Sequence, residues 1–147
     1  VNIADSVTSI SNSAFTYCTR LEQIVMPDNI TYIGAKAFDG CTKLSSVKLS
    51  GNLQTIGYHA FLDCAELCSI NIPKSLTNVN NFYDYLGYGP FEGCANLKIV
   101  EFESGVTTIP DYLFDSCTGL EEITIPSTVT SIGRDAFGYC TNLKTIY

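Results

Sequence analysis

The residues of this sequence most suited to chemistry are its seven cysteines, because a thiolate can act as a nucleophile, bind a metal ion or form a disulfide. Six of them recur at intervals of 23, 23, 30, 23 and 23 residues: Cys18, Cys41, Cys64, Cys94, Cys117 and Cys140. Such regularity marks a repeat position, and thiols that project in parallel from stacked repeats are poorly placed to form disulfides. We therefore expect six reduced and buried thiols. Cys68 lies outside the series and is the one candidate for a reactive thiol.

The single histidine, His59, is the sole candidate for the base of a Ser–His or Cys–His pair. The same repeat position holds Ser13, Lys36 and Asp135, which are residue types that water usually solvates. We therefore expect His59 to be exposed and without a catalytic role. No Cys-x-x-Cys pair, P-loop, dinucleotide fingerprint or EF-hand loop is present, so the sequence predicts neither an enzyme nor a cofactor.

The charge of the chain limits its partners. Fifteen acidic residues against eight basic ones give a net charge of −7, which argues against nucleic acid as a ligand. No apolar run reaches the ~18 residues needed to span a bilayer, so we expect no membrane insertion. Four acids in two adjacent repeats could hold Ca²⁺, although a solvated acidic face is the favoured interpretation: Glu101, Glu103, Glu121 and Glu122.

All of these residues are carried by a repeat of about 23 residues. The cysteine intervals recur in a phenylalanine column, a leucine column and several columns of Ile, Val and Leu. The unit reads F-x-x-C-x-x-L-x-x-I-x-I-P-x-x-V-x-x-I-G-x-x-A, and the phenylalanines are Phe15, Phe38, Phe61, Phe91, Phe114 and Phe137. A unit of this kind cannot bury its own apolar columns, whereas stacked units can.

Each unit predicts one strand and one short helical turn. Ile24 and Met26 alternate as in a strand with one buried face, and Pro27 ends that strand because it lacks an N–H group. The spacing in Ala37-Phe38-x-x-Cys41 suits one helical or 3₁₀ turn, preceded by a glycine that would supply a bend. Stacking then gives an α/β solenoid, with a parallel sheet on one face and short helical or 3₁₀ turns on the other.

The motif A-F-x-x-C-x-x-L-x-x-I-x-I-P, nearly intact over residues 37–49, 60–73 and 136–146, resembles the leucine-rich repeats of BspA type. That resemblance covers essentially all of residues 1–147, which we expect to form a single solenoid of about six repeats. Neither end carries the polar capping repeat that a solenoid needs, so we expect the chain to be a fragment of a longer array. BspA-type repeats occur in bacterial and protozoan surface proteins, which implies an extracellular or cell-surface location.

Two surfaces are candidates for binding. The first comprises the outward positions of the predicted sheet: Gln23, Val25, Ser46, Lys48, Ser69, Asn71, Ile99, Glu101, Glu122, Thr124 and Thr145. The second is an insertion at residues 80–90, where one repeat is seven residues longer than the others. Its aromatic side chains are candidate recognition residues: Phe82, Tyr83, Tyr85 and Tyr88. The alternative is that Phe82 and Leu86 simply cover an adjacent column of the core.

The function predicted from these features is non-catalytic binding of a protein. The resemblance to BspA-type proteins implies adhesion to host matrix or cell-surface proteins. Two alternatives are a structural spacer that displays an attached domain, and a carbohydrate-binding face built on the tyrosines of the insertion. Substitution of the sheet face separates binding from spacing, because a spacer would tolerate it.

Overall fold

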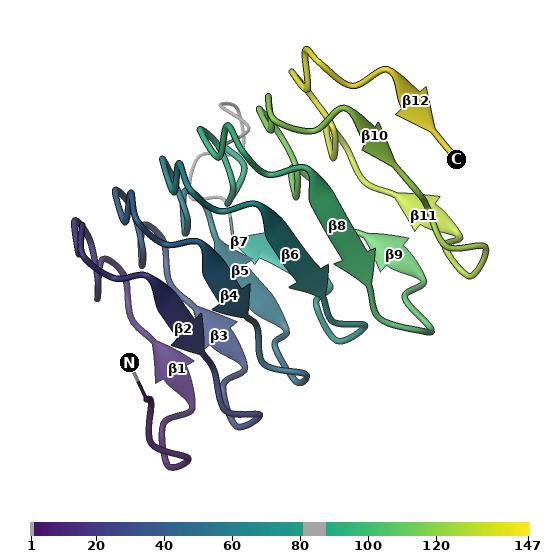
Figure 1. Ribbon diagram of the computed structural model, residues 1–147. Coiled ribbons are helices and arrows are strands. Elements are labelled where there is room, and N and C mark those ends of the chain that lie inside the picture. Colours follow the sequence, from purple (N-terminus) through teal and green to yellow (C-terminus); the bar gives the residue numbers. More distant parts are fainter. Residues whose placement is uncertain (1, 81–87) are drawn as a thin grey trace.

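In the computed structural model, which describes residues 2–80 and 88–147, the chain winds into a solenoid whose coils stack along one axis (Figure 1). Within these residues the regular elements are all short strands, and no helix is long and apolar enough to cross a membrane. The strands are β1 (Ser9–Ile10), β2 (Gln23–Val25), β3 (Tyr32–Ile33), β4 (Ser46–Lys48), β5 (Thr55–Gly57), β6 (Ser69–Ile72), β7 (Asn78–Asn80), β8 (Ile99–Phe102), β9 (Thr108–Ile109), β10 (Glu122–Ile123), β11 (Ser131–Ile132) and β12 (Thr145–Ile146).

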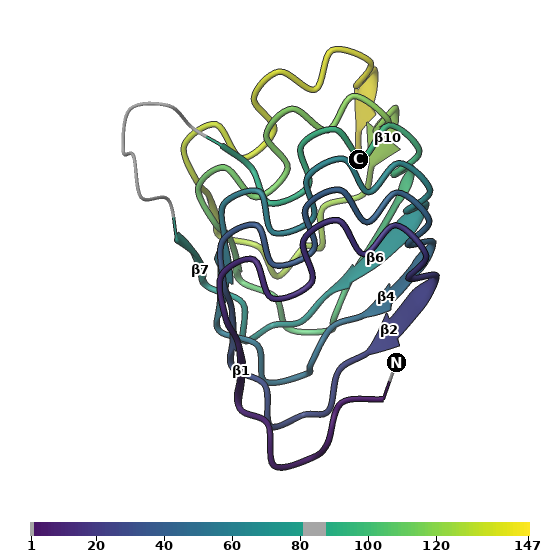
Figure 2. The same cartoon turned by 90° about the vertical axis from the view of Figure 1, so that its left-hand side faces the viewer.

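The strands form two faces, and turns form a third side of the solenoid (Figure 2). The first face consists of the parallel pairs β2–β4, β6–β8 and β10–β12, and the second consists of the sheet β1-β3-β5-β7 and the pair β9–β11. Most partners lie one repeat apart, as Ile24 and Val47 do, whereas Ile70 pairs with Val100 across the longer repeat. The insertion therefore leaves the register of the first face unchanged.

The expected helical or 3₁₀ turns are wrong, and so is the α/β class that rested on them. The structure is a β-solenoid, and no helix occurs among the described residues. The cause is a pair of left-handed residues two positions before and two positions after the column phenylalanine, as at Lys36 (φ 56°) and Gly40 (φ 69°) around Phe38. The turn of Phe91 is the exception, since only Gly93 is left-handed there. A right-handed helix cannot continue through such residues.

Alternate N–H groups of these turns bond to the next coil, and those between them bond within the turn, as Ala37 and Asp39 do to Gly34 and Lys36. The N–H groups of Lys36, Phe38 and Gly40 donate to carbonyl oxygens of the following coil, at 3.1, 2.7 and 2.9 Å. An α-helix would direct the same groups to carbonyls four residues earlier in the chain. Hydrogen bonds between coils on the turn side therefore form a third ladder, in addition to those of the two sheets. The apolar spacing alone did not predict this ladder.

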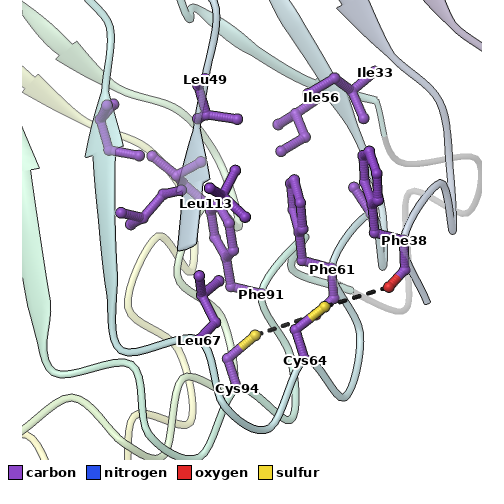
Figure 3. Close-up of a cluster of buried hydrophobic side chains, with 14 of the residues drawn as sticks. Ile33, Phe38, Leu49, Ile56, Phe61, Cys64, Leu67, Phe91, Cys94 and Leu113 are labelled. Carbon is purple, nitrogen blue, oxygen red and sulfur yellow. Dashed lines mark hydrogen bonds between the residues drawn. The ribbon is translucent and has the colours of Figure 1, made fainter. Parts of the chain in front are cut away.

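The interior is a stack of phenylalanine rings, flanked by the cysteine and leucine columns (Figure 3). The ring of Phe38 lies 5.1 Å from that of Phe15 and 5.0 Å from that of Phe61, and both pairs are nearly parallel. Phe38 and Phe61 are fully buried. The predicted apolar columns are therefore confirmed as the core.

The glycines before the turns have a different role from the one predicted. Gly34, Gly57 and Gly133 were expected to bend the backbone, yet their φ angles are not in the left-handed region. A Cβ atom on Gly57 would lie 2.3 Å from the backbone nitrogen of Ala35 in the preceding coil. Glycine is therefore required here by the close approach of two coils.

Stacking loosens where the coil that carries Phe91 meets the coil that carries Phe114. Their ring centroids lie 6.0 Å apart, compared with 5.0–5.5 Å between other neighbours in the column. The Cys117 thiol lies 3.7 Å from the Phe91 carbonyl oxygen, and neither β7–β9 nor β8–β10 forms a pair. The phenylalanine column thus continues into the coils that follow the longer repeat, although the strand pairing between coils is interrupted there.

Candidate functional site

The outward positions of the first face line up along the stack on three separate pairs of parallel strands. Alternation in the strands directs Ile24, Val47 and Ile70 into the core and their neighbours outward. Exposed on this face are Gln23, Val25, Ser46, Lys48, Ile99, Glu101, Glu122 and Thr124, and partly buried are Ser69, Asn71 and Thr145. The surface is therefore polar, with two large apolar side chains, Val25 (53% exposed) and Ile99 (54% exposed).

The acidic end of this surface is partly neutralised by lysines. Glu121 forms an ion pair with Lys144 at 2.9 Å, and this contact lowers the pKa of the Glu121 carboxyl. The Glu103 carboxylate accepts a hydrogen bond from the backbone of Lys74 at 2.8 Å. In the part of the chain that the structure describes, no three Asp, Glu, His or Cys side chains are grouped so that they could hold a metal ion.

Of the aromatic residues in the insertion, only Tyr88 can be placed. Phe82, Tyr83 and Tyr85 lie outside the described residues. Tyr88 is partly buried, and its ring lies 4.6 Å from the imidazole of His59 with a tilt of 48°. Tyr88 thus packs against a neighbouring coil. The covering role of Phe82 and Leu86 stays a prediction, because both lie outside the described residues.

The expected exposure of His59 is wrong. Only 12% of its side chain is accessible, and its Nε2 lies 2.7 Å from Oε2 of Glu92. Its Nδ1 is buried and has no hydrogen-bond partner among the described residues. Glu92 lies 33 residues further along the chain, in the next coil, and the ring of Tyr88 covers the imidazole. The polar residues at the same position of other repeats, Ser13, Lys36 and Asp135, did not indicate that Glu92 and Tyr88 would contact His59.

Asp115 is a buried carboxyl group that no motif of the sequence indicates. It is 3% exposed, and burial raises its pKa from 3.8 to about 6. The hydroxyl of Ser116 donates to its Oδ2 at 3.0 Å, which opposes the shift, while the charges of Glu92 and Asp135 add to it. Its position directly after a column phenylalanine, shared with the buried Asp39, is the only sequence signal that could have identified it.

The cysteine column is buried in the middle of the stack and accessible at its first coil. All cysteines are free; Cys41, Cys64, Cys94 and Cys117 are buried, and Cys140 is partly buried. Each of these five thiols donates to the carbonyl oxygen of a phenylalanine in the preceding coil, as Cys94 does to Phe61 at 3.1 Å. Burial raises the pKa of Cys41 to about 12 and that of Cys140 to about 11. Cys18 is exposed, contrary to the prediction, and Cys68 is exposed as predicted.

Comparison with known proteins identifies the repeat. The family model described as the BspA type leucine rich repeat region matches in six copies, over residues 1–85 and 78–147. The chain belongs to the BspA-type leucine-rich repeat family. Among the curated proteins, no match was found for this member of the family.

Solved structures of bacterial leucine-rich-repeat proteins share the fold of this BspA-type chain. The pneumococcal vaccine antigen PcpA is 26% identical with a TM-score of 0.72, over 99% of this chain and 38% of PcpA. The Treponema pallidum protein TpLRR is 26% identical with a TM-score of 0.56, over 94% of this chain and 72% of its own. A protein from Bacteroides capillosus is 37% identical with a TM-score of 0.57, over 67% of this chain and 64% of its own. This chain therefore spans well under half of PcpA and about two thirds of the other two.

Proposed function

We propose that this BspA-type module is a non-catalytic protein-binding element of a cell-surface or secreted protein. Its binding surface is the outward face of the first sheet, and its partner is a host matrix or cell-surface protein. The observation that carries the proposal is the composition of that face, where Val25 and Ile99 lie exposed among uncharged and charged polar side chains.

The rigidity of this face supports binding to a macromolecule. Its outward side chains project from strands whose inward neighbours are buried, so the surface is formed before any partner arrives. A preformed surface loses little conformational entropy on binding. Isolated apolar side chains within a polar surround resemble the centre and rim of a protein interface.

A location outside the cell is supported by the family and by one relative. Resemblance to BspA-type repeats implies a surface protein, and PcpA is named as a vaccine antigen. The net charge of −7 would keep such a module from associating with nucleic acid.

The proposal is tested by measuring binding of residues 1–147 to immobilised fibronectin, fibrinogen, collagen and laminin at physiological salt. The double variant Val25→Ser with Ile99→Ser should weaken binding to the recognised protein by about tenfold or more, since loss of an interface anchor typically costs ~1–2 kcal/mol. The control is Ile132→Ser, which removes an apolar side chain of equal exposure, 53%, from the second sheet.

Two results would contradict the proposal. Equal weakening by the double variant and by Ile132→Ser would place the binding surface elsewhere. Absence of binding to all four proteins would favour the spacer, whose attached domain would carry the activity.

A further inference from the structure

The second sheet is interrupted between β7 and β9, and the interruption leaves backbone groups without partners among the described residues. In the continuous part, the carbonyl oxygen of Thr31 accepts hydrogen bonds from Gln54 and Thr55 of the next coil, at 2.9 and 3.2 Å. The equivalent bonds from Thr107 and Thr108 to the carbonyl of Thr77 do not form between described residues. The ladder resumes one coil later, where β9 pairs with β11.

Two features of the sequence account for the interruption. The N–H groups of Gly34 and Gly133 donate to the preceding coil, at 2.7 and 2.8 Å. Pro110 occupies the equivalent position and has no N–H, so it cannot bond to the carbonyl of Val79. The extra residues of the longer repeat also fall directly after β7.

A depression of about 430 Å³ lies at this interruption, which is within the size range of ligand sites. Its walls are β7 on one side and β9, residues 110–112, Ser131, Gly133 and Arg134 on the other. The far wall is held in place by hydrogen bonds from the backbone of Arg134 to Asp111 Oδ1 at 2.8 Å and from the backbone of Tyr112 to the Arg134 carbonyl at 2.9 Å. The Arg134 guanidinium also lies 5.2 Å from the centre of the Tyr112 ring.

We propose that this depression binds an extended peptide segment of a protein partner, which adds a strand between β7 and β9. One wall offers the carbonyl oxygens of Thr77 and Val79 as acceptors, and the other offers the N–H group of Thr108 as a donor, with that of Thr107 directly before it in the chain. An extended peptide presents donors and acceptors along both edges, so it matches both walls at once. A ligand without an amide backbone, such as a sugar, has no such regular array.

The side chains of the depression define the class of peptide. The outward side chains at its rim are the amides of Asn78 and Asn80 and the hydroxyls of Thr108 and Ser131. In a parallel strand, alternate side chains of the peptide would face this polar rim while the others face the core. The site therefore suits peptides that alternate between polar and small apolar residues. It lies on the second sheet and does not depend on the face proposed above, so either proposal can fail without the other.

The probe is a displayed library of random nine-residue peptides selected against the intact chain, from which the most enriched peptide is synthesised. Binding of this peptide should slow amide exchange of Thr107 and Thr108 at least tenfold and leave Gln54 and Thr55 unchanged. N-methylation of alternate peptide residues, which removes the donors, should weaken binding at least tenfold. The variant Asn78→Trp should weaken it equally, because the indole would fill the depression.

The matched control for Asn78→Trp is Thr55→Trp, since Thr55 is paired with Asn78 in the neighbouring coil at the same outward position. The control should bind the peptide as the unaltered chain does, and both variants should melt at similar temperatures. The proposal is overturned if no peptide is enriched, if the N-methylated peptide binds equally well, or if Thr107 and Thr108 exchange in the free protein as slowly as Gln54 and Thr55.

Discussion

Replacement of Asp115 by asparagine should stabilise the stack at neutral pH and lose most of that effect in acid. The carboxyl group is buried where the ladder between coils is interrupted, and the charges of Glu92 and Asp135 raise its pKa further. An ionised Asp115 therefore opposes folding. Asparagine keeps an oxygen that can accept the Ser116 hydroxyl and removes the charge.

The magnitude follows from the change in pKa. The folded value of about 6 exceeds the ordinary value of 3.8, so the folded chain binds more protons than the unfolded chain between these two values. Stability contributed by this group therefore falls as the pH rises through that window. With ~1.4 kcal/mol for each pKa unit, the ionised side chain costs roughly 3 kcal/mol at pH 7.5 and about 1 kcal/mol at pH 4.5. Asp115→Asn should thus stabilise the chain by roughly 2–3 kcal/mol at pH 7.5 and by about 1 kcal/mol at pH 4.5.

The assay is urea denaturation at both pH values, followed by circular dichroism and by tyrosine fluorescence so that a two-state transition can be verified. Asp39→Asn is the control, because Asp39 occupies the same repeat position and is similarly buried at 6% exposure. The residues at the same repeat position in the two adjacent coils, Thr16 and Leu62, are uncharged. Substitution of Asp39 should therefore stabilise the chain less. A gain at Asp115 that is independent of pH, or an equal gain at Asp39, would refute the explanation.

Two further predictions concern the core. Titration of the native chain with a thiol reagent should detect about two groups, Cys18 and Cys68, rising to all seven on unfolding, and more than two in the native state would contradict the burial of the column. Phe61→Ala should lower the free energy of unfolding, measured by chemical denaturation, by ~3–5 kcal/mol because rings pack on both sides of Phe61. Phe15→Ala should lower it less because Phe15 is partly exposed and stacks on one side only. Equal losses would argue against a continuous column.

The repeat by itself determined which residues form the core and that the strands of the first sheet are parallel. Columns of Phe, Cys, Leu and Ile at a constant interval can be buried only by stacking, which places equivalent strands side by side in parallel. The alternation around Ile24 then decides which side chains point inward. These properties depend on local periodicity, and periodicity is visible in a single sequence.

The tertiary structure decided what lies between coils. The apolar spacing around Phe38 fits a helical turn as well as the observed one, and only hydrogen bonding to the next coil selects the left-handed residues that exclude a helix. His59 contacts Glu92 because the coil after the longer repeat still stacks in register on the coil before it. The two residues are 33 positions apart, which matches no fixed interval of the motif. The raised pKa of Asp115 likewise depends first on its burial within the stack and then on charges from two neighbouring coils. Such contacts are set by how coils stack, and that stacking is a property of the folded chain rather than of any one repeat.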